Sequence, residues 1–196
     1  MKNSIIDTII ARRSCRAFKP EMPSDELLSQ VIEAGRHAPS GANNQTTKFI
    51  VIQRPEVFVR LSELFQEEFA AMDYDENTYV SLKGAIVRAK KGGPFVICYD
   101  APVLVLLVNR KGYGNAMADC CCALENMAIA ATSLGLGNCY INSPHWMTDS
   151  EPVREYLYTL GLDENETVCC SLAVGYSAEG EKKPLERKGN PVIYIK

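Results

Sequence analysis

Hydrophobic residues recur at helical spacing in some segments and in short β-branched runs in others, which predicts a mixture of helices and strands. Helical spacing starts near Ser4 and again at Ser24, where the second helix ends before Pro39, and it continues over 55–72, 83–91, 115–134 and 149–160. Strand-like runs cover 48–53, 103–109, 137–142, 167–176 and, at the end of the chain, 190–196. The elements begin with two helices and contain few strand–helix–strand units. We therefore expect an α+β fold, a mixed central sheet flanked by helices, in a single domain over residues 1–196.

Two segments are apolar enough to lie at the centre of this fold. Pro102–Val108 is a continuous apolar run, far shorter than the ~20 residues that cross a bilayer, and it predicts a strand buried on both faces. The helix over 115–134 is apolar nearly all round, so we expect it to pack centrally. Residues 73–94 have the weakest pattern and predict a loop with a short basic helix, which would form a cover over part of the molecule.

Composition and charge narrow the class of protein. The chain has 196 residues, of which 46% are hydrophobic and 23% charged, as is ordinary for a globular protein. The net charge of −3 lacks the basic excess of a generic nucleic-acid binder, so any anion site has to come from a local cluster of Arg and Lys. The first residues put charges inside what would be the apolar part of a secretion signal. We therefore expect a cytoplasmic protein whose partners include neither nucleic acid nor membrane.

The cysteines and histidines argue against metal and nucleophilic chemistry. Cys120–Cys122 are consecutive in a predicted helix, where neighbours point about 100° apart and do not converge on one ion. No C-x-x-C occurs among the eight cysteines, and the only two histidines, His37 and His145, are far apart in sequence. The cysteines fit small buried hydrophobes in a reducing compartment, with a redox or metal role as the alternative. No metal site and no Ser/His/Asp set is indicated, and we nominate no catalytic side chain.

Two clusters of cationic residues mark a candidate phosphate site. Arg12, Arg13 and Arg16 lie within five residues, together with Ser14, and guanidinium groups bind phosphate through paired hydrogen bonds. A solvated surface explains this cluster equally well. A second cluster, which in isolation is more typical of a solvated loop, lies near the end of the chain and contains Lys182, Lys183 and Arg187.

Two further stretches are candidates for contact with a flat ligand. In Ala38–Gln45 (APSGANNQ), Gly41 permits close approach of the backbone, and the amide side chains at 43–45 offer donors and acceptors to the edge of a heterocycle. A polar turn between a helix and a strand is the alternative. Ser133–Ser143 (SLGLGNCYINS) has its glycines after a helix rather than a strand, so it is not a dinucleotide-binding G-x-G-x-x-G loop, and Gly135 by itself fits a helix C-cap.

In their order and spacing, these motifs resemble the nitroreductase family of FMN oxidoreductases. The resemblance rests on R-R-S-x-R at 12–16, A-P-S-G-x-N-x-Q at 38–45, L-G-L-G at 134–137 and K-K-P-L at 182–185, and it runs from about Ile5 to Arg187. The first two motifs are the more specific. The resemblance implies an intertwined homodimer with FMN at the subunit interface, to which the last strand would contribute by pairing with the partner.

The resemblance also implies roles for individual residues. The arginine-rich motif holds the flavin phosphate and ribityl chain, with Arg16 near the pyrimidine end of the ring, and the late cationic cluster completes the phosphate site. The segment 39–45 comes from the partner subunit. The strand after L-G-L-G passes the ring, although Asn142 and Ser143 depart from the glycine that is usual there. The implied cofactor-binding residues are Arg12, Arg13, Ser14, Arg16, Pro39, Ser40, Gly41, Asn43, Gln45, Ile141, Asn142, Ser143, Lys182, Lys183 and Arg187.

Flavin carries the difficult step in such enzymes, so the protein needs no acid, base or nucleophile of its own. The resemblance implies reduction by NADH or NADPH and reoxidation by a nitroaromatic, quinone or enone-like acceptor, in a ping-pong cycle. A specialised flavin reaction, such as dehalogenation or dehydrogenation, and a non-catalytic flavin-binding protein are the alternatives. Arg88, Lys90 and Lys91 fit a 2′-phosphate site and a solvated helix face equally well, so the sequence does not choose the donor.

Overall fold

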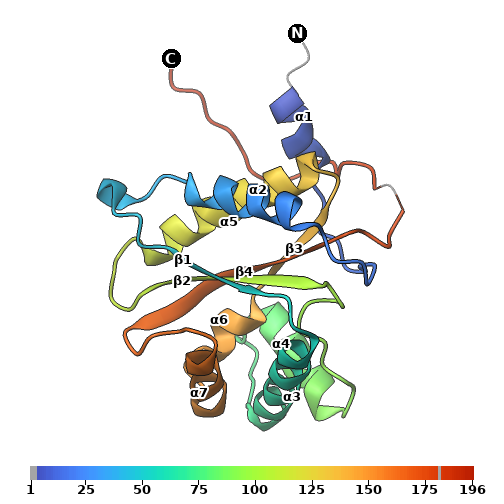
Figure 1. Ribbon diagram of the computed structural model, residues 1–196, viewed down its shortest axis with the longest axis vertical. Helices are drawn as coiled ribbons and strands as arrows, with labels where there is room; N and C mark the ends of the chain where they lie inside the picture. Colours follow the sequence, from blue (N-terminus) through green and yellow to red (C-terminus); the bar gives the residue numbers. More distant parts are fainter. Residues whose placement is uncertain (1–3, 181) are drawn as a thin grey trace.

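A four-stranded sheet forms the middle of the molecule (Figure 1). The computed structural model describes residues 4–180 and 182–196. The strands are β1 (Lys48–Ile52), β2 (Val103–Arg110), β3 (Gly137–Ile141) and β4 (Glu166–Gly175), in the order β1-β2-β4-β3. All three pairings in this sheet are antiparallel, and parallel pairing in the described chain is limited to a bridge between Ser14 and Asn138. The predicted α+β class is confirmed, but the strands of the sheet are antiparallel rather than mixed in direction.

Helices cover both faces of the sheet (Figure 1). One face carries α2 (Asp25–Arg36) and α5 (Ala116–Ser133), and the other carries α3 (Pro55–Ala71), α4 (Val80–Lys90), α6 (Ser143–Met147) and α7 (Glu151–Thr159). Each layer has its own apolar core, because alternate residues of a strand point to opposite faces. None of the described helices has the length and apolar character needed to span a membrane.

The central strand and the central helix are those that the hydrophobic pattern predicts. Every residue of Val103–Val108 is fully buried, since β2 has a strand on each side and helices on both faces. Helix α5 packs on the sheet and against α2, where a Cβ at Gly35 would lie 2.7 Å from Met127 Cγ. The missing side chain of Gly35 thus allows the two helices to approach closely.

The end of α5 directs the chain into β3. Gly135 has a φ of +77°, and its N–H donates to Thr132 O at 3.1 Å, while Leu136 N–H donates to Ala131 O at 2.8 Å. This pair of bonds is a Schellman C-cap, which satisfies carbonyls that the last helical turn leaves open. The predicted C-cap role of Gly135 is confirmed.

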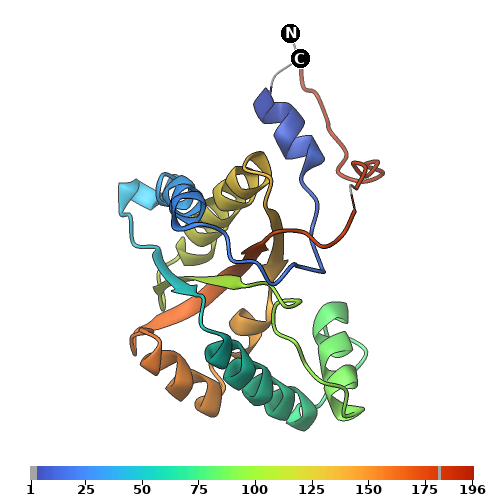
Figure 2. The same cartoon turned by 45° about the vertical axis from the view of Figure 1, so that its right-hand side comes forward.

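Three local expectations differ from the structure. The basic helix over 83–91 begins earlier, at Val80 in α4, and the short helix α6 after β3 was not expected. The segment 190–196 forms no strand, because no strand edge of the same chain lies beside it to supply hydrogen bonds. It extends from the body together with α1 (Ser4–Ala11), as Figure 2 shows.

Both chain ends expose apolar side chains. In α1, Ile9 and Ile10 are 44% and 56% exposed, and in the C-terminal segment Ile193 and Ile195 are 86% and 96% exposed. Exposed apolar residues that are gathered in one region are typical of surfaces that contact another protein.

Candidate functional site

The arginine-rich segment runs along the free edge of β3. Cys15 N–H donates to Asn138 O at 2.8 Å, and Ser14 forms the parallel bridge to the same residue. These main-chain contacts fix the path of residues 12–16, so that their side chains are presented at two cavities, one at each end of the strand.

The first cavity, of about 350 Å³, is lined by both cationic clusters. Arg13 and Ser14 line it from the N-terminal segment, and Lys182 lines it from the C-terminal segment. Gly135 and Gly137, which have no side chains, also line it. Lys182 Nζ donates to Ser14 O at 3.1 Å, and the Arg13 guanidinium donates to Lys183 O. Residues that are about 170 positions apart in sequence are therefore brought together, as the phosphate prediction requires.

The remaining cationic candidates do not line this cavity. Arg12 is directed toward α5, where its Nε is 3.9 Å from Glu125 Oε1. Lys183 contributes its carbonyl to the Arg13 contact, and its side chain is exposed, as is that of Arg187. Of the three late cationic residues, Lys182 is the one that lines the cavity.

Glu179 links the cationic residues to one another. Its carboxylate accepts from Arg16 N–H at 2.9 Å and lies 2.7 Å from Lys182 Nζ. The hydrogen bond from Lys182, together with the one from Arg16 N–H, lowers the pKa of Glu179 below its ordinary value. The carboxylate is therefore charged at neutral pH and holds Lys182 at the mouth of the first cavity.

The second cavity, of about 410 Å³, lies beyond the other end of β3. Arg16, Ile141, Asn142 and Ser143, which the resemblance assigns to the flavin ring, all line it. The Arg16 guanidinium hydrogen-bonds to the Tyr99 side chain, which raises the pKa of Arg16 above its ordinary value. The rest of the wall comes largely from α4 and from the aromatic residues Phe95, Tyr99, Tyr140 and Trp146.

The segment 39–45 is a tight loop on the other helical layer of the molecule. It contains the 3-10 helix η1 (Gly41–Asn43), and three non-glycine residues have positive φ: Ala42 at 51°, Asn43 at 53° and Gln45 at 51°. Hydrogen bonds within the loop hold it, from Gln45 N–H to Ser40 Oγ at 3.0 Å and from Gln45 Nε2 to Asn43 Oδ1 at 3.2 Å. Left-handed backbone at three such residues stores strain that its surroundings must balance.

Asp119 of α5 supplies that support. Its carboxylate is only 6% exposed, accepts from Gly41 N–H at 3.1 Å and accepts from Tyr113 Oη at 3.1 Å. A Cβ at position 41 would lie 2.2 Å from Asn115 Nδ2 and 2.6 Å from Tyr113 Oη, so both side chains would have to move to admit it. Glycine is therefore needed at 41 for close packing rather than for an unusual φ.

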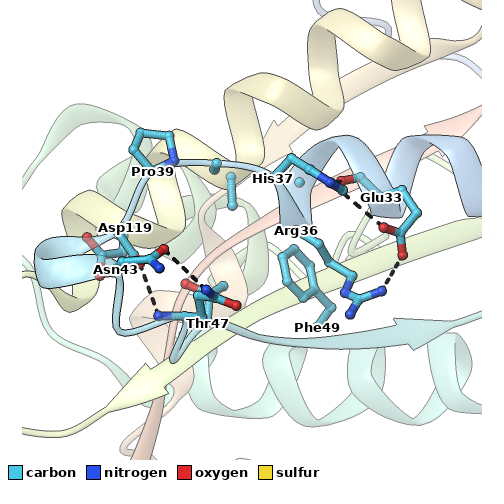
Figure 3. Close-up of a pocket in the computed structure, with 13 residues that line it drawn as sticks. Glu33, Arg36, His37, Pro39, Asn43, Thr47, Phe49 and Asp119 are labelled. Atoms are coloured by element: carbon cyan, nitrogen blue, oxygen red, sulfur yellow. Dashed lines mark hydrogen bonds and ion pairs between the residues drawn. The ribbon is translucent and has the colours of Figure 1, made fainter.

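The loop borders a third cavity, of about 480 Å³, which is separate from the other two. Pro39, Ser40, Asn43 and Gln45 line it together with the end of α2 and with Phe49. In Figure 3, Asn43 and Asp119 lie on one side of this cavity, and Glu33, Arg36 and His37 lie on the other. Among the described residues, no member of the 12–16 segment lines it. One copy of the chain thus brings the predicted residues together in two groups, not in one.

Several residues that shape the site were missed by the sequence reasoning. Asp119 carried a signal, as the one acid near the start of an otherwise apolar helix, which implies a buried partner. Trp146 lies in α6, where Pro144 near the start is a helix signal that was not used. Tyr99 and Glu179 carried none, since their contacts with Arg16 depend on the tertiary fold.

The fold and these cavities define a class of protein: an α+β chain with a cation-lined pocket at one end of an edge strand and an aromatic pocket at the other. The model of the nitroreductase family matches residues 9–176. The chain belongs to the nitroreductase family, as its motifs predicted.

Solved structures and sequence relatives agree with this assignment. A nitroreductase with bound FMN from Bacteroides fragilis is 34% identical, with a TM-score of 0.86 over 99% of this chain and 100% of that one. Another, also with bound FMN, from Desulfitobacterium hafniense is 30% identical, with a TM-score of 0.82 over the full length of both chains. An FMN reductase (NADPH) from Bacillus subtilis is 28% identical over 93% of this chain and 70% of its own length.

Proposed function

We propose that this chain is an FMN-dependent oxidoreductase that takes electrons from NADH or NADPH and passes them to a small acceptor such as a nitroaromatic or a quinone. The observation that carries the proposal is the pair of cavities joined by residues 12–16 along β3, one lined by cations and one by aromatic residues. A phosphate monoester and a flat heterocycle joined by a short polar chain need this combination. Membership in the nitroreductase family supports the same class of enzyme.

The residues of one copy fit part of FMN. Arg13, Ser14 and Lys182 would hold the phosphate, with Arg12 beside them, and Arg16 would face the pyrimidine edge of the ring. In this role the cation of Arg16 favours the reduced, negatively charged form of the cofactor. Ile141, Asn142 and Ser143 would lie along the ring.

The second group, Pro39, Ser40, Gly41, Asn43 and Gln45, would complete the site of a partner copy. The separation of the third cavity from the first two supports this division, because one chain does not bring the groups together. The exposed apolar chain ends supply surface for such an interface. We therefore propose a homodimer of single-domain subunits, acting in the cytoplasm.

Bound FMN supplies the electron transfer, so the protein's part is to bind, orient and exclude water. Arg16 and the aromatic wall of the second cavity would leave one open face for a flat ligand. Donor and acceptor would occupy that space in turn, which gives a ping-pong pattern.

An absorption spectrum of the purified protein, before and after anaerobic addition of NADH and then NADPH, tests this proposal. We expect a yellow protein that is bleached by at least one of the two donors and regains its colour with a nitroaromatic or a quinone. A flavin that neither donor bleaches would contradict the reductase. A colourless protein that also fails to bind added FMN would contradict the cofactor assignment.

A further inference from the structure

One face of α4 lines the second cavity. Ser81, Gly84, Ala85 and Arg88 all line it, and their spacing of three, four and seven residues places them on one side of a helix. The residues at 81, 84 and 85 have small side chains or none, so they extend little from this side of the helix. Arg88 is therefore the one long polar side chain that α4 presents to the cavity among the described residues.

The other cations of α4 are engaged elsewhere. Lys83 Nζ lies 5.2 Å from the centre of the Tyr74 ring, and Lys90 Nζ lies 5.8 Å from the same ring and 3.5 Å from Asp73 Oδ1. Lys83 and Lys90 are seven residues apart, so they lie on the same side of the helix. Arg88 is five residues from Lys83 and two from Lys90, so it lies on a different side. One helix thus carries a cation at the cavity and two on a neighbouring surface.

The cavity around Arg88 is aromatic and lacks negative charge. No carboxylate lines it among the residues that the structure describes, whereas Arg16 and Arg88 both do. Phe95 and Trp146, on its wall, are backed by the fully buried Phe69, with ring centres 5.2 Å and 6.5 Å away. A wall fixed in this way selects flat ligands, and the charge of Arg88, with no carboxylate on the described cavity wall, selects anionic ones.

The Arg16 guanidinium already has a partner in the Tyr99 side chain, and it faces the expected ring edge of FMN. Arg88 is left for the ligand that enters over the flavin. We propose that Arg88 binds the carboxylate of the acceptor, so that the preferred acceptors are aromatic carboxylates. This inference rests on the proposed flavin reductase function.

Equilibrium binding of benzoate, which does not react, is the first test. The flavin-loaded protein is titrated with benzoate and with neutral benzamide, and binding is followed by the change in flavin absorption. Because a guanidinium–carboxylate pair is strong and directional, Arg88→Gln should weaken benzoate binding about 10-fold or more and leave benzamide unchanged. Lys90→Gln is the matched control: it removes the same charge from the same helix, on the side that contacts Tyr74 and Asp73, and should change neither ligand.

Turnover extends the test to acceptors. For 4-nitrobenzoate, Arg88→Gln should lower kcat/KM by a similar factor, and for methyl 4-nitrobenzoate kcat/KM should stay within about twofold. Equal losses for both acceptors, or equal losses in Arg88→Gln and Lys90→Gln, would overturn the inference. A loss confined to the rate of flavin reduction by NADPH, with NADH unaffected, would overturn it too, because Arg88 would then serve the 2′-phosphate of the donor.

Failure of the inference is distinguishable from failure of the proposed function. A protein that both acceptors reoxidise equally well, before and after Arg88→Gln, is a reductase without the proposed selectivity. A protein whose flavin neither donor reduces is not a reductase, and benzoate binding then still decides whether Arg88 forms an anion site.

Discussion

The two groups of predicted cofactor-binding residues are held in contrasting ways. Residues 12–16 lie along a sheet edge, fixed by main-chain hydrogen bonds to Asn138, so their side chains are available at the cavities. The loop 39–45 is strained at three residues and depends on one buried carboxylate, that of Asp119. The first arrangement is held by the fold, and the second is held by hydrogen bonds within the loop and by the carboxylate of Asp119. A substitution in residues 12–16 should therefore act by removing contacts to the ligand. A substitution that affects residues 39–45 should act by changing the shape of the loop.

The largest effect is expected from the cationic group. Replacing Arg12 and Arg13 together with Ala removes the proposed charge-assisted contact of Arg13 to the phosphate, worth about 1.5–3 kcal/mol, and the neighbouring charge of Arg12, so FMN affinity should fall about 10- to 100-fold. Fluorescence titration of the unloaded protein with FMN measures this. The protein should stay folded, because neither side chain is part of the core. Arg60→Ala, which breaks an exposed ion pair with Glu63 on α3, is the control. A double variant that retains its flavin would disprove the phosphate assignment.

Mixed dimers test whether the two groups meet across subunits. With Arg12→Ala on one chain and Asn43→Ala on the other, one of the two shared sites keeps both residues, so about half of the flavin should remain. With both changes on one chain and a wild-type partner, each shared site loses one residue and neither is intact. Flavin content per dimer distinguishes the two cases. If each site belonged to a single chain, the two mixed dimers would give the reverse result.

A smaller effect is expected from the support of the loop. Asp119→Ala leaves the partly buried Gly41 N–H without its acceptor, at a cost of about 1–3 kcal/mol. We expect the melting temperature to fall by several degrees, at about 2–4 °C per kcal/mol, and FMN affinity to fall about 10-fold because the loop loses its shape. Asp119→Asn keeps one oxygen and should recover part of both losses. A fall in melting temperature with unchanged FMN affinity would place the loop outside the site.

The smallest effect is expected from Glu179. The pKa of Glu179 is lowered in the folded protein, so its contribution to stability is present above the unfolded value of about 4.5 and is lost as pH falls through the folded value. Wild type should melt about 2 °C above Glu179→Gln at pH 7, and the gap should close as pH falls below about 4. Glu186→Gln, in an exposed pair with Lys188, is the control and should show no gap. A difference in melting temperature that grows as pH falls would contradict the assigned direction of the Glu179 pKa shift.

The sequence predicted most of the fold, because the relevant signals are local. The buried run of β2, the apolar α5 and the C-cap at Gly135 each follow from a pattern within about 20 residues. The sequence also predicted that the two cationic clusters meet, as Arg13, Ser14 and Lys182 do at one cavity, but it did not choose among Lys182, Lys183 and Arg187. The segment 190–196 forms no strand within one chain, and its predicted pairing with a partner copy stays a prediction, since apolar alternation does not say which strand edge is available. The contacts of Asp119 and Tyr99 join distant segments, which no local pattern records.

The exposed apolar residues at the two chain ends bear on how the stability of the protein depends on its concentration and on FMN. If Ile9, Ile10 and the apolar residues of 192–195 are covered only when two copies meet, folding and pairing are one reaction. The melting temperature would then rise with protein concentration, and added FMN would raise it further by binding the paired form alone. In a cell that is short of flavin, the same linkage would leave more unpaired chains, with their ends open to proteolysis.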